Sequence, residues 1–174
     1  VTTCYLYRWC VFMEELLKEH QQLGTNSEFK ISVEVATFFD HIYETLKHSK
    51  PSSSPSQNGE LTTVACSPSK RAEIVSQLGQ SGSDFRNQLY NTGLSGKQTT
   101  ISINKCSEFF GIARDHLEHT INNNEREDSL FHSYNLIRWE NDEIFIDHLD
   151  EMLEGQVAAL SAGLLDPPTT ADLL

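Results

Sequence analysis

Apolar residues recur at helical spacing along most of this chain, and this periodicity constrains the possible folds more than any other feature. In the first stretch, one helical face holds Leu6, Trp9, Met13, Leu16 and Leu17. Gly24 follows at the position of a C-terminal cap. Similar patterns predict helices over residues 4–24, 31–49, 70–80, 83–93, 107–121 and 147–163. The chain is therefore predicted to be mainly α and built from helical hairpins.

Three segments of the form I-x-[VI]-[END], starting at positions 31, 101 and 144, each precede a run with helical periodicity. Each is predicted to be a short extended segment that ends at a helix N-cap, with Asn104 and Asp147 better suited to capping than Glu34. Residues 134–147 alternate in polarity on both sides of Asn141 and Asp142, which predicts one small β-hairpin. The repeat favours an array of helical hairpins, with chance similarity as the alternative.

The segment 49–67 is rich in serine and proline and has few residues to bury, so we expect a disordered surface insertion. It does not divide the chain into two cores. We expect residues 1–174 to be a single helical domain or a fragment of a larger one. The first residue is Val1 rather than methionine, so the remainder of a longer chain is an expected partner.

Charge excludes some partners. The chain has a net charge of -12, and residues 101–174 hold 15 acidic residues against four basic ones. Nucleic acid requires a basic face, and an anionic membrane surface attracts one, so we expect neither partner. Neutral ligands such as carbohydrates, and protein partners, remain open.

The sequence has no apolar run long enough to span a membrane and no secretory leader at its start. Four cysteines occur, without metal-site spacing or the density of a disulfide scaffold: Cys4, Cys10, Cys66 and Cys106. We expect buried or free thiols in a reducing compartment, and therefore a cytoplasmic protein.

Two groups of carboxylates are candidates for catalysis: Glu125, Glu127 and Asp128 at the end of the fifth predicted helix, and Glu151 and Glu154 one turn apart on the sixth. Glycoside hydrolysis uses two carboxyl groups, one protonated and one ionised, on either side of a sugar. One residue from each group would meet this requirement. The alternative is structural, with Glu151 and Glu154 exposed and Asp128 capping a turn.

Histidines give a weaker signal. His116 and His119 lie three residues apart, but no third ligand accompanies them, so a solvated helix face is favoured over a metal site. His132 has the pKa range of a general acid or base, although packing beside Trp139 and Tyr134 is the favoured interpretation. No nucleotide-binding or nucleophile-elbow motif occurs, and we expect no metal and no cofactor.

The phrases EREDSLFHSYNLI and HLDEMLEGQVAALSAGLL resemble part of large bacterial proteins of the six-hairpin glycosidase-like type. The likeness covers about the last third of the chain. It implies a segment of an (α/α) toroid whose loops line a carbohydrate-binding funnel. The chain departs from the family pattern at Ser129, where glycine is usual, and at Asp150, where an aromatic residue is usual.

Two functions follow as expectations. In the first, a carbohydrate-active toroid segment, Asp128 or Glu127 works with Glu151 or Glu154. The residues expected to position the sugar are Arg126, His132, Tyr134 and Trp139. In the second, the chain is a non-catalytic helical scaffold or protein-interaction domain. The stretch REDSLFHSYNLI is predicted to be mainly a structural junction packed on the last predicted helix.

Overall fold

The computed structural model describes residues 1–22, 27–51, 53–55, 61–63 and 66–173. Its six helices are α1 (Thr2–Gln22), α2 (Val33–His48), α3 (Pro68–Thr92), α4 (Ile103–Asn122), α5 (Leu153–Ala162) and α6 (Pro167–Leu173). The described strands form three antiparallel pairs: β1 (Glu28–Ser32) with β4 (Gln98–Ser102), β2 (Ser53–Pro55) with β3 (Leu61–Thr63), and β5 (Asn135–Glu140) with β6 (Glu143–His148). The mainly α fold with short strands is therefore confirmed.

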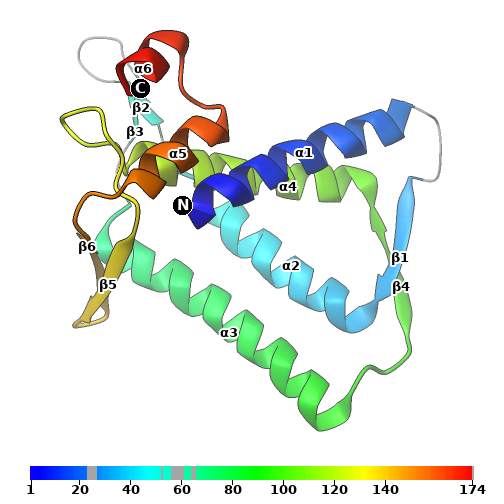
Figure 1. The fold of residues 1–174 in the computed structure, drawn as a ribbon. Coiled ribbons are helices and arrows are strands. Elements are labelled where there is room, and N and C mark those ends of the chain that lie inside the picture. Colours follow the sequence, from blue (N-terminus) through cyan, green and yellow to red (C-terminus); the bar gives the residue numbers. More distant parts are fainter. Residues whose placement is uncertain (23–26, 52, 56–60, 64–65, 174) are drawn as a thin grey trace.

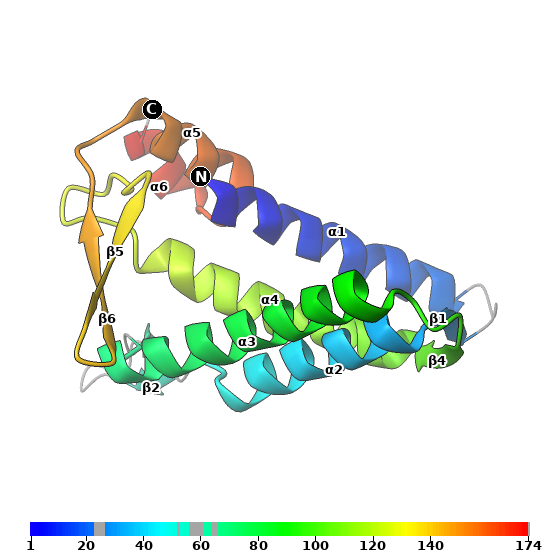
Figure 2. The ribbon, with the colours of Figure 1, turned by 90° about the horizontal axis from the view of Figure 1, so that it is seen from below.

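The four long helices run lengthwise between two small ribbons. In Figures 1 and 2, β1 and β4 lie at one end, and β5 and β6 lie at the other end with α5 and α6. Helix α1 packs mainly on α4, and α2 packs on α3, while α2 also contacts α4. The β5–β6 hairpin contacts α3 through β6, so it lies across the ends of the helices.

An approximate two-fold repeat relates two helix–strand–helix units, α1–β1–α2 and α3–β4–α4. The β1–β4 pairing places Lys30 opposite Thr100, 70 residues later. The ends of α1 and α3 (22 and 92) and the starts of α2 and α4 (33 and 103) are separated by the same interval. Two of the three I-x-[VI]-[END] segments lie at these equivalent strand-to-helix junctions, where such a junction was predicted.

The helix N-caps at these junctions are serines, contrary to prediction. The hydroxyls of Ser32 and Ser102 each accept a hydrogen bond from the amide three residues later, at 3.3 and 3.2 Å. Glu34 and Asn104 lie inside the first turn instead, because the extended backbone ends two residues earlier than expected. The third segment does not start a helix. Asp147 lies within β6, where its carboxylate accepts a hydrogen bond from Arg138 on β5 at 3.0 Å.

Helix α3 is continuous, although two helices were expected over this region. Gly79 and Gly82 lie inside it, and glycine costs a helix about 1 kcal/mol relative to alanine. Packing on α2 offsets this cost, because Phe85 stacks on Phe38 with ring centroids 4.7 Å apart. The predicted stop at Gly93 is confirmed, with a φ of 69° that favours glycine.

The C-terminal elements also differ from the prediction. Residues 143–148 form β6, so the last predicted helix begins only at Leu153 and ends as expected before Gly163. The predicted hairpin is confirmed. Its turn uses Asn141 and Asp142 in left-handed conformations, with φ of 48° and 63°, which these side chains tolerate better than most. Helix α6 was missed, although Asp166 caps it by accepting a 2.8 Å hydrogen bond from the Thr169 amide.

The predicted disordered insertion holds the short pair β2 and β3. Residues 52, 56–60 and 64–65 of that segment lie outside the described residues, and its disorder stays a prediction. Among the described residues, no helix combines the length and apolar character needed to cross a lipid bilayer.

A buried hydrophobic cluster lies where the start of α1, the end of α4 and α5 meet. Its buried members are Cys4, Ile121, Phe131, Ala158, Ala159 and Ala162. The small residues of α5 allow this close approach. Cys4 and Cys10 are buried free thiols, and Cys66 and Cys106 are partly buried free thiols. The cluster fixes the loop after α4, which carries most of the predicted site residues.

Candidate functional site

Three of the predicted site residues meet around one guanidinium group. Arg126 donates two parallel hydrogen bonds to the carboxylate of Asp128, at 2.9 and 2.7 Å. The same guanidinium also bonds Glu151, which arrives from the segment between β6 and α5. The side chains of Asp128 and Glu151 are about half exposed, at 49% and 58%. One residue from each predicted set of carboxylates therefore contacts Arg126, but the contact lies at the protein surface.

The charge state of this cluster does not suit the predicted acid and base. Hydrogen bonds from Arg126 lower the pKa of Asp128 below its ordinary value, so this carboxyl is ionised at neutral pH. Glycoside hydrolysis requires one of two carboxyl groups to be protonated. Arg126 favours the ionised form of Asp128 over the protonated form. The cluster is therefore an ion-pair network that ties the loop after α4 to the start of α5.

The other two predicted catalytic carboxylates do not join this cluster. Glu127 is exposed in the loop, and Glu154 is exposed in the first turn of α5. The prediction that Glu151 and Glu154 share a helix face is wrong, because Glu151 precedes the helix. The reason is that residues 143–148 pair with β5 as a strand, so α5 begins only at Leu153.

His132 is held by aromatic stacking. Its ring lies on the ring of His148 from β6, with centroids 3.7 Å apart and planes 8° from parallel. Burial lowers the pKa of His132 below its ordinary value, and the charges of His148 and Arg126 lower it further. His132 is therefore neutral at pH 7. Its Nδ1 is buried and has no hydrogen-bond partner among the described residues.

The two aromatic residues predicted to bind sugar are exposed. Tyr134 has 44% of its surface exposed, and Trp139 on β5 has 51% exposed, at opposite ends of the strand region 134–140. The neighbouring Phe131 and Ser133 are buried instead. The junction prediction for REDSLFHSYNLI is confirmed at Phe131, whose amide donates to the side chain of Gln156 on α5 at 2.8 Å.

A small cavity of about 190 Å³ adjoins this junction. His132, Ser133 and Tyr134 line one side of it, and the first residues of α1 line another. None of the four predicted catalytic carboxylates is among the described residues that line it. The cavity that His132 and Tyr134 line therefore does not include the predicted catalytic carboxylates among its described lining.

A larger cleft of about 750 Å³ lies next to the small cavity, and the two share Thr120, Asn124 and Asn135 as lining residues. The cleft is formed by the end of α2, the start of α3, the end of α4 and the β5–β6 hairpin. Its described lining includes four histidines: His48, His116, His119 and His148. It also includes the cations Lys50, Lys70 and Arg71, and no Asp or Glu.

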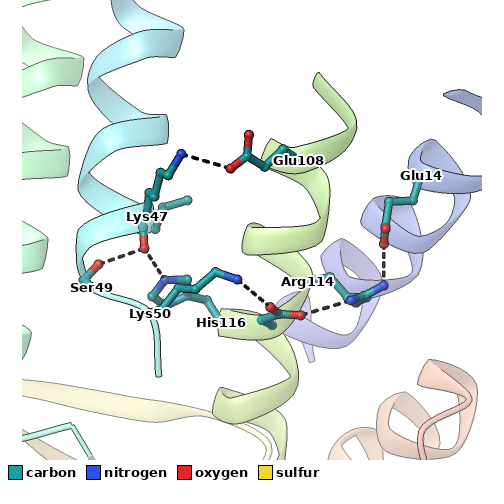
Figure 3. A network of polar contacts seen from close by, with 9 residues as sticks. Glu14, Lys47, Ser49, Lys50, Glu108, Arg114 and His116 are labelled. Atoms are coloured by element: carbon teal, nitrogen blue, oxygen red, sulfur yellow. Dashed lines mark hydrogen bonds and ion pairs between the residues drawn. The ribbon is translucent and has the colours of Figure 1, made fainter. Parts of the chain in front are cut away.

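A network of polar contacts connects one wall of this cleft to α1 (Figure 3). Arg114 on α4 bonds Glu14 of α1 at 2.5 Å and Asp115 at 3.1 Å, and Asp115 accepts from Lys50 at 3.3 Å. Beside it, His116 hydrogen-bonds the Leu46 carbonyl oxygen at 2.9 Å. These contacts place Lys50 and His116 at the edge of the cleft.

The sequence did not identify this cleft, because its walls come from four segments far apart in the chain. His116 and His119 were recognised as a pair on one helix face, and both line the cleft. Among the described residues, no group of three or more His, Cys, Asp or Glu side chains is arranged to hold a metal ion.

Comparison with known proteins gives no further guidance. No protein-family model matches this chain, and a search of curated proteins gives no match. The functional conclusion therefore depends on the geometry and chemistry of the residues themselves.

Proposed function

We propose that this chain is a helical interaction domain, and that the outward face of α1 packs against further helices. The observation that carries this proposal is an exposed apolar stripe along α1. Its members are Tyr5, Trp9, Phe12 and Leu16, each between 44% and 53% exposed. The stripe is the site at which a partner would bind.

The stripe has the spacing of a helix–helix contact. Its residues follow at intervals of four, three and four, so they lie above one another on a single face. The rings of Trp9 and Phe12 contact each other, with centroids 5.8 Å apart. The opposite face of α1 buries Cys4, Cys10 and Leu17. A helix that is apolar on both faces is typical of a buried position between two layers.

The surface area of the chain supports the same conclusion. Its accessible surface is 11236 Å² for a mass of 19.7 kDa. A monomeric globular protein of this mass exposes about 8600 Å². The difference exceeds the roughly 800 Å² that each partner contributes to a standard protein–protein interface. A partner that covers α1 and the exposed Leu153 and Val157 of α5 would bring the surface closer to the usual value.

The partner should present an apolar helical face, because only such a surface interdigitates with a stripe of this spacing. Charged residues flank the stripe on one side, namely Arg8, Glu15 and Glu19. A partner helix with charges of both signs beside its apolar face would complement them. Such charge pairs determine the orientation of the partner helix more than they increase its affinity for the stripe.

Fluorescence of Trp9 tests the proposal. Trp139→Phe leaves Trp9 as the only tryptophan, so its emission reports on the stripe alone. At dilutions where the chain is monomeric, we expect red-shifted emission, strong acrylamide quenching and binding of a hydrophobic dye. Phe12→Ser should reduce dye binding, whereas Tyr90→Ser should not, because Tyr90 is an isolated exposed aromatic on α3. Blue-shifted Trp9 emission that acrylamide does not quench in the monomer would contradict an exposed stripe.

The second candidate is the carbohydrate-active (α/α) toroid that the resemblance implies. The exposed rings of Tyr134 and Trp139 favour it, because aromatic faces stack on sugars. In a ring of helical pairs, neighbouring pairs would also cover α1. The ionised Arg126 cluster would then bind substrate rather than donate a proton.

Titration with neutral oligosaccharides tests this candidate. Binding that Trp139→Ala and Tyr134→Ala each weaken, and that Tyr90→Ala leaves unchanged, would support it. Asp128→Asn should then abolish turnover in the assembled protein without loss of the fold. No binding of any neutral oligosaccharide would remove the candidate and leave the interaction domain.

A further inference from the structure

The larger cleft has a charge that differs from the rest of the chain. The whole sequence has a net charge of -12, yet three cations and no carboxylate line the cleft among its described residues. Nearby carboxylates outside the lining pair with two of these cations, Asp115 with Lys50 and Glu73 with Lys70. Both ion pairs are solvent-exposed, so each is weak and easily rearranged.

Arg71 has no such pairing among the described residues. Its guanidinium donates to two backbone carbonyl oxygens, that of Ile144 on β6 at 2.6 Å and that of Cys66 at 3.0 Å. These bonds hold the side chain in place but leave its positive charge without a described carboxylate within ion-pair distance. A partly buried, fixed cation beside a cavity attracts an anion from solvent.

The remaining lining combines apolar side chains, among them Pro51, Ile74, Val75 and Ile146, with hydrogen-bonding side chains that suit an oxygen-rich ligand. The hydrogen-bonding groups include the imidazoles of His48, His116, His119 and His148 and the amides of Asn123 and Asn124. The start of α3 also lies at the cleft, through Ser67, so the positive end of a 25-residue helix dipole adds to the local potential. The volume of about 750 Å³ is in the range of small-molecule sites.

We propose that this cleft binds a small phosphate ester of a polyhydroxylated compound, with Arg71, Lys70 and Lys50 around the phosphate and the histidine and asparagine side chains around the hydroxyl groups. A phosphate monoester carries a charge of about -1.5 to -2 at pH 7 and three acceptor oxygens. The three cations of the cleft match the charge of a phosphate monoester better than the single negative charge of a carboxylate ligand. The proposal is independent of the interaction face on α1.

Isothermal titration of the intact chain at low ionic strength tests the proposal with four probes: glucose 6-phosphate, inorganic phosphate, glucose and glucuronate. We expect glucose 6-phosphate to bind more tightly than inorganic phosphate, because hydroxyl contacts add to the phosphate contacts. Glucuronate should bind more weakly than the phosphate ester, and glucose should show no binding. Added salt should weaken the binding of the ester.

Variants locate the site. Lys70→Gln and Lys50→Gln should each weaken glucose 6-phosphate binding by roughly fivefold, the factor expected for losing one exposed charge contact. Arg71→Gln should weaken it by tenfold or more, with circular dichroism used to confirm that the fold survives. Lys30→Gln is the matched control, since Lys30 lies on β1 at the opposite end of the molecule and its loss should have less than a twofold effect (Figure 1).

Three results would overturn the proposal. They are the absence of binding by glucose 6-phosphate, glucose binding as tight as that of the ester, and an equal loss in Lys30→Gln and Lys70→Gln. The first would show that the cleft holds no phosphate site. The second would indicate a neutral sugar site, and the third would indicate general electrostatic attraction. The two lysine variants keep the test decisive if Arg71→Gln fails to fold.

Discussion

The rings of His132 and His148 stack face to face, 3.7 Å apart, and join the loop after α4 to the β5–β6 hairpin. Two neutral imidazoles stack favourably, whereas two imidazolium ions repel each other at this distance. The stack therefore links the packing of the hairpin to the protonation of His132.

The first prediction concerns pH. Because the folded-state pKa of His132 is lower than its unfolded-state value, the unfolded chain binds more protons as the pH falls. The free energy of unfolding should therefore decrease as the pH falls from about 7.5 through the ordinary histidine range near 6.5. Urea denaturation at a series of pH values measures this.

The control for this prediction is His148→Phe, which keeps a ring against His132 and removes the neighbouring charge that, in addition to burial, lowers the pKa of His132. Its pH dependence between about 5 and 7 should be shallower than that of the unaltered chain. A steeper pH dependence in His148→Phe would exclude repulsion within the stack as its source.

The second prediction concerns Gly155, which begins the buried face of α5. A Cβ atom at this position would lie 2.8 Å from the carbonyl oxygen of Phe131 and would also meet the Ser133 side chain. Gly155→Ala should destabilise the chain by about 1–3 kcal/mol, as overpacking usually does. Thermal denaturation gives the value.

Gly82→Ala is its matched control, because Gly82 lies inside α3 and a Cβ there would meet nothing within 4 Å. This substitution should stabilise the chain by about 0.5–1 kcal/mol through helix propensity. Equal effects of the two substitutions would show that α5 does not pack closely against residues 131–133.

The third prediction compares two aromatic residues in the junction. Phe131 is 3% exposed within the buried hydrophobic cluster, so Phe131→Ala should cost about 3–5 kcal/mol. Tyr134 is 44% exposed, so Tyr134→Ala should cost about 1 kcal/mol or less. Chemical denaturation of both variants tests the order, and a larger loss in Tyr134→Ala would contradict the described packing.

The fourth prediction concerns Glu14, whose side chain is only 11% exposed and bonds Arg114 across the α1–α4 contact. Glu14→Gln should cost about 1–3 kcal/mol, because Arg114 loses a charged partner in a partly buried position. Glu15→Gln, on the exposed side of the same helix turn, should change stability by less than about 0.5 kcal/mol. Similar losses in both would indicate a general charge effect rather than this contact.

The elements that follow from local patterns were predictable. Helices α1, α2 and α4 have an apolar period, and the β5–β6 hairpin alternates about an Asn-Asp turn, so each is visible within a short window. The continuity of α3 was not predictable, because the contact of Phe85 with Phe38 on α2 offsets the cost of the glycines to the helix.

The candidate site was predictable only in part. A meeting of one carboxylate from each group was expected, and Asp128 and Glu151 are the two that meet, but the arginine between them changes what the pair can do. Arg126 had been assigned to the substrate rather than to its two acidic neighbours. The cleft was missed because lysines and histidines from distant segments give no local signal until the helices are assembled.

The two-fold repeat also has a kinetic consequence. Within the part of the chain that the structure describes, strand β1 has no partner in its own helix–strand–helix unit and neither has β4, since each pairs with the other. The ribbon therefore forms only after about 70 residues of chain have closed into a loop, which is entropically slow compared with helix formation. We expect helices to form within microseconds and the strand pairing to limit the folding rate, so that substitutions in β1 and β4 slow refolding more than those on exposed helix faces.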